Sequence, residues 1–161
     1  MIKQVRIKLI LLESISLVFL VNGLQRLYMA SQGSKYDALI NENWEKFESL
    51  TSQTAGQFFA NRTYWTIGFI LIGTLTISFI NWKYTIRVIN SIILFLIISG
   101  ISMTGFFLQG ITNRYLNYFC GLFGGKYGFS FLVGGFILTL IGILILWKTI
   151  NDYKSTIHNK A

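Results

Sequence analysis

The chain of 161 residues contains no proline. Proline removes a backbone hydrogen bond and is the most frequent cause of a sharp kink inside a helix. The helices of this protein therefore cannot be kinked by proline, and glycine is the residue that could interrupt them. The glycines within the apolar runs do not form the GxxxG association motif, and the nearest pairs of small residues spaced four apart are Ser130 with Gly134 and Gly135 with Thr139. We expect these small residues to allow close helix packing.

Cysteine and histidine occur once each, as Cys120 and His158. A single cysteine cannot form an internal disulfide or a CxxC redox or metal pair. A single histidine in a polar tail cannot supply bis-histidine haem ligation or a histidine-based zinc site. Four-helix thiol oxidoreductases, which need paired cysteines, are thereby excluded. We expect neither a metal nor a cofactor.

Acidic residues are also few, with six Asp and Glu against fourteen Lys and Arg, for a net charge of +8. Apart from Glu13, no acidic residue falls inside the long apolar stretches, so a two-carboxylate site or a nucleophilic triad lacks members. The sequence therefore predicts that the chain is not an enzyme. We interpret the positive charge as a topology signal and expect no nucleic-acid partner.

Apolar residues are abundant, with 53% hydrophobic and 12% charged residues and a mean hydropathy of +0.56. Four continuous apolar runs are each close to the roughly 20 residues that a helix needs to cross a hydrocarbon core of about 30 Å. Continuous rather than alternating runs favour helices over barrel strands. The sequence predicts an all-α integral membrane protein of one domain, a four-transmembrane-helix bundle with spans at 9–29, 64–81, 88–108 and 129–147.

The distribution of Lys and Arg predicts the orientation of these spans. Eight basic residues lie in the N-terminal segment, the short turn 82–87 and the tail 148–161. The other six are Arg26, at the outer end of the first span, and five residues spread over the longer loops 30–63 and 109–128. The positive-inside rule then places both termini in the cytoplasm. We expect the first apolar run to be retained rather than cleaved as a signal peptide. The richness in Ile, Asn and Lys fits a bacterial inner membrane.

The first outer loop, 30–63, predicts one amphipathic helix with an acidic polar face. This helix could lie flat on the membrane surface, or it could cap the bundle and dock a partner. Its net acidic charge favours the cap, with Trp44 and Phe47 as candidate partner-docking residues. The apolar face consists of Tyr36, Leu39, Ile40, Trp44, Phe47, Leu50 and Phe58.

The second outer loop, 109–128, contains five glycines and several aromatic residues. Because glycine tolerates positive φ, we expect the end of this loop, residues 121–128, to be irregular. A short re-entrant or interfacial segment would fit this composition.

Glu13 raises the question of function most directly. It lies about 6 Å of helix rise past the start of the first run, so its side chain could reach the cytoplasmic interface, at a depth similar to Asn90. One interpretation is an orienting ion pair or hydrogen bond near the headgroups. The other is a proton or cation site, in which the carboxylate is neutral towards lipid and charged towards a cavity. The shallow position of this lone carboxylate favours the first.

A second polar group lies near the other end of the first span, where Asn22, Gln25 and Arg26 can share one helix face because they are three and four residues apart. We expect this face to meet other helices or the acidic loop helix. The expected acidic partners of Arg26 are Glu42, Glu45 and Glu48.

These observations leave open more than one functional class. The first hypothesis is a non-catalytic accessory, structural or regulatory subunit of a membrane assembly, whose partners are the lipid bilayer and a membrane protein or further copies of the chain. The alternative is an oligomeric transporter or channel for an ion or small solute that uses Glu13, or Asn90, near the cytoplasmic mouth. A lipid-facing enzyme or lipid binder in the outer aromatic loops is a third class, without a specific motif.

Overall fold

The computed structural model describes residues 7–84, 86, 88–109 and 111–158. Within these residues the chain forms helices and no strands, which confirms the all-helical prediction. The helices are α1 (Ile7–Ser31), α2 (Gly33–Ile40), α3 (Trp44–Leu50), α4 (Ala55–Lys83), α5 (Val88–Met103), α6 (Ile111–Gly121) and α7 (Tyr127–His158).

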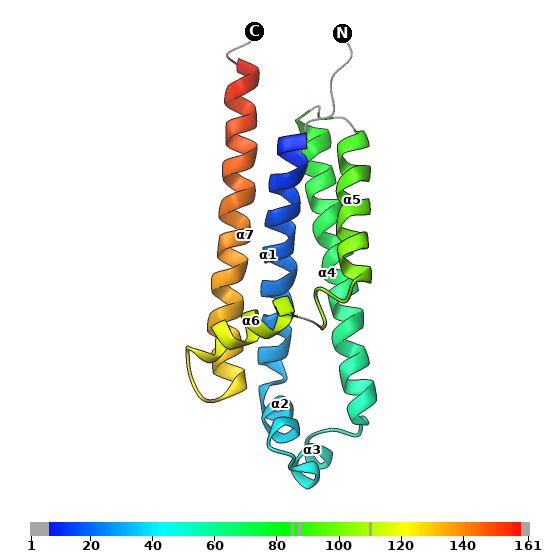
Figure 1. Ribbon diagram of the computed structural model, residues 1–161, viewed down its shortest axis with the longest axis vertical. Coiled ribbons are helices and arrows are strands. Elements are labelled where there is room, and N and C mark those ends of the chain that lie inside the picture. The colour runs from blue at the N-terminus through cyan, green and yellow to red at the C-terminus, as the bar shows by residue number, and fades with distance from the viewer. Residues whose placement is uncertain (1–6, 85, 87, 110, 159–161) are drawn as a thin grey trace.

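Four helices, α1, α4, α5 and α7, run along the long axis of the molecule (Figure 1). Helix α1 lies in the centre and packs against α7 on one side and against α4 and α5 on the other. The start of α1 and the end of α7 lie at one end of the bundle, which we call the termini end. Helices α2 and α3 form the opposite loop end, and α6 crosses the bundle between the two and packs on α7.

Three of these helices are long and apolar enough to cross a membrane: α1, α4 and residues Tyr127–Tyr153 of α7. Helix α5 has 16 residues, and its length of about 24 Å falls short of a typical hydrocarbon core. It ends at Met103 rather than at 108 as expected, and Gly105 in the following turn has a φ of 75°. The structure thus provides three candidate spans, and it indicates a membrane protein.

The contact between α1 and α7 depends on small residues. A Cβ atom on Gly23 would lie 2.6 Å from the backbone N of Thr139, and one on Gly135 would lie 2.9 Å from the backbone O of Gly23. Further along, Ser16 Oγ donates a hydrogen bond to Gly142 O at 2.8 Å. The expected use of Gly135 and Thr139 in close helix packing is therefore confirmed.

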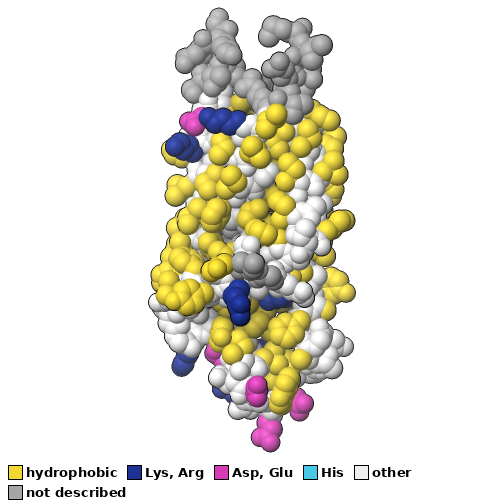
Figure 2. Space-filling model, in the orientation of Figure 1, with side chains coloured by type: hydrophobic (Ala, Val, Ile, Leu, Met, Phe, Trp, Pro, Cys, Tyr) yellow, Lys and Arg dark blue, Asp and Glu magenta, His cyan; other side chains and the backbone are white. Residues whose placement is uncertain are grey.

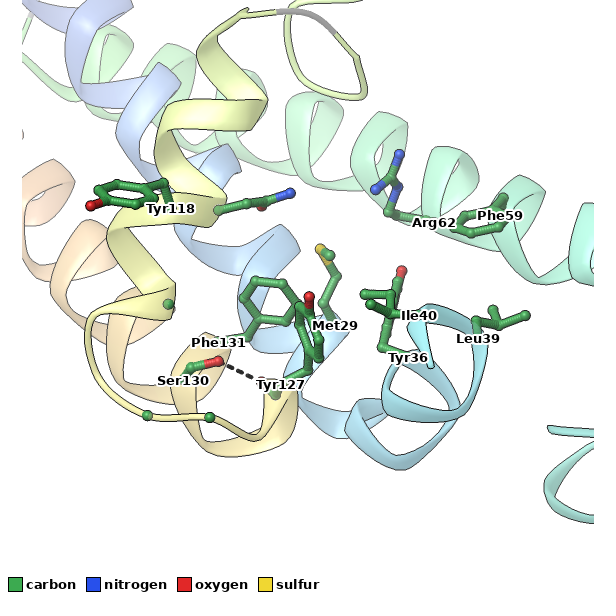
Figure 3. A pocket seen from close by; sticks show the side chains of 14 residues that line it. Met29, Tyr36, Leu39, Ile40, Phe59, Arg62, Tyr118, Tyr127, Ser130 and Phe131 are labelled. Carbon is green, nitrogen blue, oxygen red and sulfur yellow. Dashed lines mark hydrogen bonds between the residues drawn. The ribbon is translucent and has the colours of Figure 1, made fainter. Parts of the chain in front are cut away.

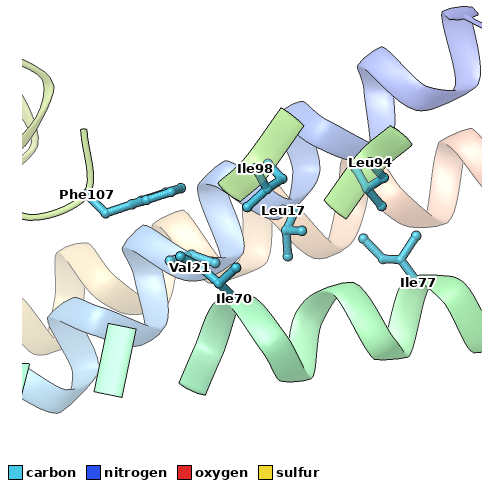
Figure 4. Packing of buried hydrophobic residues seen from close by; sticks show 7 residues of the cluster. All are labelled: Leu17, Val21, Ile70, Ile77, Leu94, Ile98 and Phe107. Carbon is cyan, nitrogen blue, oxygen red and sulfur yellow. The ribbon is translucent and has the colours of Figure 1, made fainter. Parts of the chain in front are cut away.

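A hydrophobic cluster fills the middle of the bundle between α1, α4 and α5 (Figure 4). Its side chains are almost completely buried, and they interdigitate without a polar group among them. In water, the burial of such side chains is the main favourable contribution to helix packing. Inside a membrane, where the surroundings are also apolar, helices associate through the close van der Waals fit of these side chains. The cluster comprises Leu17, Val21, Ile70, Ile77, Leu94, Ile98 and Phe107.

The first outer loop folds as two short helices, α2 and α3, in place of the single amphipathic helix that was expected. Glu42 between them has a φ of 53°, which a continuous helix cannot include. Asn43 then caps α3 by accepting a hydrogen bond from Lys46 N at 3.0 Å. Of the two docking candidates, Phe47 is 2% exposed and packs on Phe58, whereas Trp44 is 55% exposed.

The start of α4 lies well before residue 64, where the second span was expected to begin. Thr54 and Gln57 form a capping box, in which each side chain hydrogen bonds to the backbone N of the other residue. This cap begins the helix at Ala55 and adds more than two turns on the loop side.

Candidate functional site

Two buried polar centres lie at different heights of the bundle. The first surrounds Arg26, which is fully buried in α1. Its Nη1 donates to Asn22 Oδ1 at 3.1 Å and to Gln25 Oε1 at 3.1 Å. Its Nη2 donates to Asn113 Oδ1 at 2.9 Å and to Asn117 Oδ1 at 3.0 Å, both on α6. Side-chain amides thus supply most of the acceptors for this buried guanidinium, and they join α1 to α6.

The same network reaches α4. Gln25 Nε2 donates to Thr66 Oγ1 at 2.8 Å, and Thr66 Oγ1 in turn donates to Arg62 O at 2.8 Å. Asn22, Gln25 and Arg26 therefore lie in one network. This network faces other helices of the bundle rather than the acidic loop helix, which was the other expectation for this group. Thr66 was not singled out from the sequence, and nothing in its local surroundings distinguishes it.

The expected acidic partners of Arg26 do not reach it. Glu42, Glu45 and Glu48 are exposed at the loop end, and the hydrogen bonds of Arg26 within the described residues go to amide and backbone oxygens. The reason is that α6 covers Arg26. Asn113 and Asn117 are four residues apart on α6, so both amides face α1. Two asparagines spaced four residues apart in an amphipathic segment were the feature of the sequence from which this site could have been predicted.

The second polar centre surrounds Glu13, nearer the termini end. Its carboxylate is 1% exposed and accepts a hydrogen bond from Asn81 Nδ2 at 3.2 Å. The Oδ1 atoms of Asn81 and Asn90 are also buried, and neither has a hydrogen-bond partner within the described residues. The Glu13 side chain therefore turns into the bundle instead of extending to the headgroups. From the sequence, Arg6 is expected seven residues before Glu13 on the same helix face and Arg87 at a similar depth, but both lie outside the described residues.

The two centres are separated by the hydrophobic cluster described above. Glu13 and Arg26 are 13 residues apart in one helix, a rise of about 20 Å, so they cannot pair directly. Leu17 and Val21, which lie between them along α1, are completely buried in the hydrophobic cluster. Ser16 and Thr74 are also buried between the two centres, and their hydroxyls donate hydrogen bonds to the backbone oxygens of Gly142 and Ile70, each at 2.8 Å.

Neither centre gathers several of the side chains that most often bind metal ions. Within the described residues no group of three or more His, Cys, Asp or Glu side chains could hold a metal ion. Cys120 lies beside Arg26 but is completely buried. Burial raises the pKa of the Cys120 thiol, an effect that the nearby Arg26 guanidinium opposes. A buried thiol of this kind packs as a small apolar side chain.

Fold and polar centres together define a helical protein with three candidate membrane spans and two amide-rich buried centres. Comparison of the chain with family models, curated proteins and solved structures gave no match.

Proposed function

We propose that the chain is a non-catalytic accessory subunit that packs beside a larger membrane protein in the plasma membrane of a bacterium. The observation that carries this proposal is the hydrophobic cluster at the centre of the bundle (Figure 4), because apolar side chains that fill the axis of a single chain oppose the passage of ions and polar solutes. The polar side chains around Arg26 hydrogen bond to one another and join the helices, which suits a structural or regulatory role.

The outer faces of the long helices supply a surface for such a partner. Leu75 and Phe79 on α4, and Phe136 and Leu144 on α7, are each more than half exposed. Apolar side chains cover the flank shown in Figure 2, and the acidic side chains gather mainly at the loop end. Helix α7 packs on α1 but not appreciably on α4 or α5, so a partner helix can enter beside it.

In this proposal the chain crosses the membrane four times with both termini in the cytoplasm. Helix α5 is short, but a bilayer thins locally around a short span at a modest cost. The turn between α4 and α5 is brief, so these helices form a hairpin whose second arm returns towards the loop end. Reporter fusions to the two termini and to 104–109 test this topology, and a terminus found outside contradicts it.

Copurification tests the accessory role. We expect the tagged chain, extracted in a mild detergent, to bring down one membrane protein in stoichiometric amount. A photo-crosslinking residue at Phe136 should capture that partner, while the same residue at Leu17, inside the bundle, should not. A chain that migrates alone, or as a ring of its own copies, contradicts the proposal.

An oligomeric transporter or channel is the second candidate, and one observation favours it. Glu13 lies with Asn81 in a buried centre where the Oδ1 atoms of Asn81 and Asn90 have no partner within the described residues. A carboxylate can take up a proton, and together with amide oxygens it can coordinate a hard cation. Flux driven by an ion gradient in liposomes, lost in Glu13→Gln and kept in Glu45→Gln, would support this function over the accessory role.

A further inference from the structure

A cavity of about 440 Å³ lies between α2, α4, α6 and α7, at the height where the bundle meets the loop end. Figure 3 shows its lining: Arg62 projects from α4, Tyr36 rises from α2, and Tyr127, Ser130 and Phe131 come from α7. Phe59 and Tyr118, which also line it, are 44% and 73% exposed, so the cavity is open to the outside of the bundle.

Two hydrogen-bond donors in this cavity are unused. The hydroxyl of Tyr36, a side chain that is only 3% exposed, and Nε of Arg62 have no well-aligned hydrogen-bond partner within the described residues. The Arg62 guanidinium lies close enough to this hydroxyl to oppose the rise in its pKa. Leaving buried polar atoms unpaired costs free energy, typically about 1–3 kcal/mol for each group. Arg62 is held in place by a hydrogen bond from its Nη2 to Leu108 O at 2.9 Å and by its position 5.8 Å from the Phe59 ring.

The charge of the cavity is positive. No carboxylate lines it. Asp37, on α2, is occupied as a cap for α7, where its Oδ1 accepts a hydrogen bond from Tyr127 N at 3.0 Å. Arg26 lies close enough to Arg62 for the two guanidinium groups to repel each other. An anion between the donors would relieve this repulsion and satisfy both unused groups.

The position of the cavity selects the kind of anion. Tyr28, next to Met29, and Trp65, about one turn after Arg62, form an aromatic pair with ring centroids 5.5 Å apart. Amphipathic rings of this kind mark the headgroup level of a membrane. The remaining walls are apolar, with Met29, Leu39 and Phe131 among them. Such a cavity suits a charged group that carries an apolar tail.

We propose that this cavity binds the phosphate of an anionic phospholipid headgroup, with Arg62 Nε and the Tyr36 hydroxyl donating to its oxygens. Arg62 supplies the charge, Tyr36 adds a neutral donor, and the acyl chains stay beside the exposed faces of α4 and α6. The ligand holds α2, α4, α6 and α7 together, since each contributes to the wall.

Native mass spectrometry of the full chain in detergent tests this proposal. We expect phosphatidylglycerol to bind at least about tenfold more tightly than phosphatidylcholine with the same acyl chains. Both lipids offer the same phosphate oxygens, but choline adds a positive charge beside Arg62, which repels it. Arg62→Gln should remove that preference, and Arg62→Lys should restore part of it. Tyr36→Phe, which keeps the ring packing, should weaken phosphatidylglycerol binding roughly threefold to tenfold.

Two matched variants serve as controls. Arg114 and Tyr115 are exposed on α6 and do not line the cavity, so Arg114→Gln and Tyr115→Phe should leave lipid binding unchanged. Thermal unfolding of each variant identifies any that fail to fold. If Arg62→Gln does not fold, lipid binding by Arg62→Lys and Tyr36→Phe is compared with that of the wild type instead.

The outcomes separate the possible sources of the anion. Inorganic phosphate that binds with the same dependence on Arg62, without any preference among lipids, would support the anion site and assign it to a soluble ligand. Equal binding of the two lipids and of phosphate by the wild type and by Arg62→Gln would overturn the proposal. The pKa of Tyr36 is raised by burial to about 12, so its hydroxyl remains protonated and binding should not change between about pH 6 and pH 9.

Discussion

Adding one methyl group to Gly23 should separate the two helices that make the most extensive contact in the molecule. The new Cβ would lie 2.6 Å from the backbone N of Thr139 and 2.9 Å from the backbone O of Gly135. Carbon atoms at an optimal contact are about 3.5–4.0 Å from their neighbours. Because backbone atoms cannot rotate away as a side chain can, α1 and α7 must move apart by about 1 Å.

The expected cost follows from that displacement. Overpacking of this kind costs about 1–3 kcal/mol, and the better helix propensity of alanine returns up to about 1 kcal/mol. Gly68 in α4 provides the matched control, since a Cβ there meets nothing within 4 Å. Gly68→Ala should therefore be neutral or slightly stabilising, and the two variants should differ by about 2 kcal/mol.

Thermal unfolding in detergent, followed by circular dichroism, measures this difference. For a chain of this size about 2 kcal/mol corresponds to a shift of about 4–8 °C in the midpoint. We expect Gly23→Ala to unfold at the lower temperature. Equal midpoints for the two variants would show that the helices do not approach each other as closely as described.

Three further predictions concern the polar centres and the loop end. Asn113→Ala removes a charged hydrogen bond from the buried guanidinium and should lower the free energy of unfolding by about 1–3 kcal/mol, measured as above. Glu13→Gln keeps an acceptor for Asn81 and should insert and accumulate normally, whereas Glu13→Leu should reduce the amount of stable protein. Phe47→Ser should expose 41–54 to protease because it removes a buried ring, while Trp44→Ser should leave cleavage unchanged; equal protection of both variants contradicts the packing of α3.

The helical class and the approximate place of the apolar helices could be predicted from the sequence, because long runs of apolar residues have few other stable states in a membrane. The ends of the helices were harder to predict. The start of α4 depends on the capping box of Thr54 and Gln57, a local signal that an analysis of hydropathy alone passes over. The end of α5 depends on a turn at Gly105, although the apolar run continues beyond it.

The candidate site was predictable in part for a different reason. The shared face of Asn22, Gln25 and Arg26 follows from helix geometry, so it could be deduced from spacing. Their partners Asn113 and Asn117 lie about 90 residues further along the chain, and only the packing of α6 on the bundle brings them together. The split between α2 and α3 was missed because a helical wheel assumes a continuous helix, and the left-handed φ of Glu42 breaks that assumption.

The central position of α1 has a consequence for synthesis. The first long helix to leave the ribosome packs most extensively on the last one, and the hydrogen bond from Ser16 to Gly142 joins residues 126 positions apart. At about 5–20 residues per second, α1 waits roughly 6–25 s for α7. Throughout that interval the small-residue surface of α1 remains uncovered, and a chain that stops early never covers it. The packing of α1 therefore cannot be completed before α7 has been synthesised.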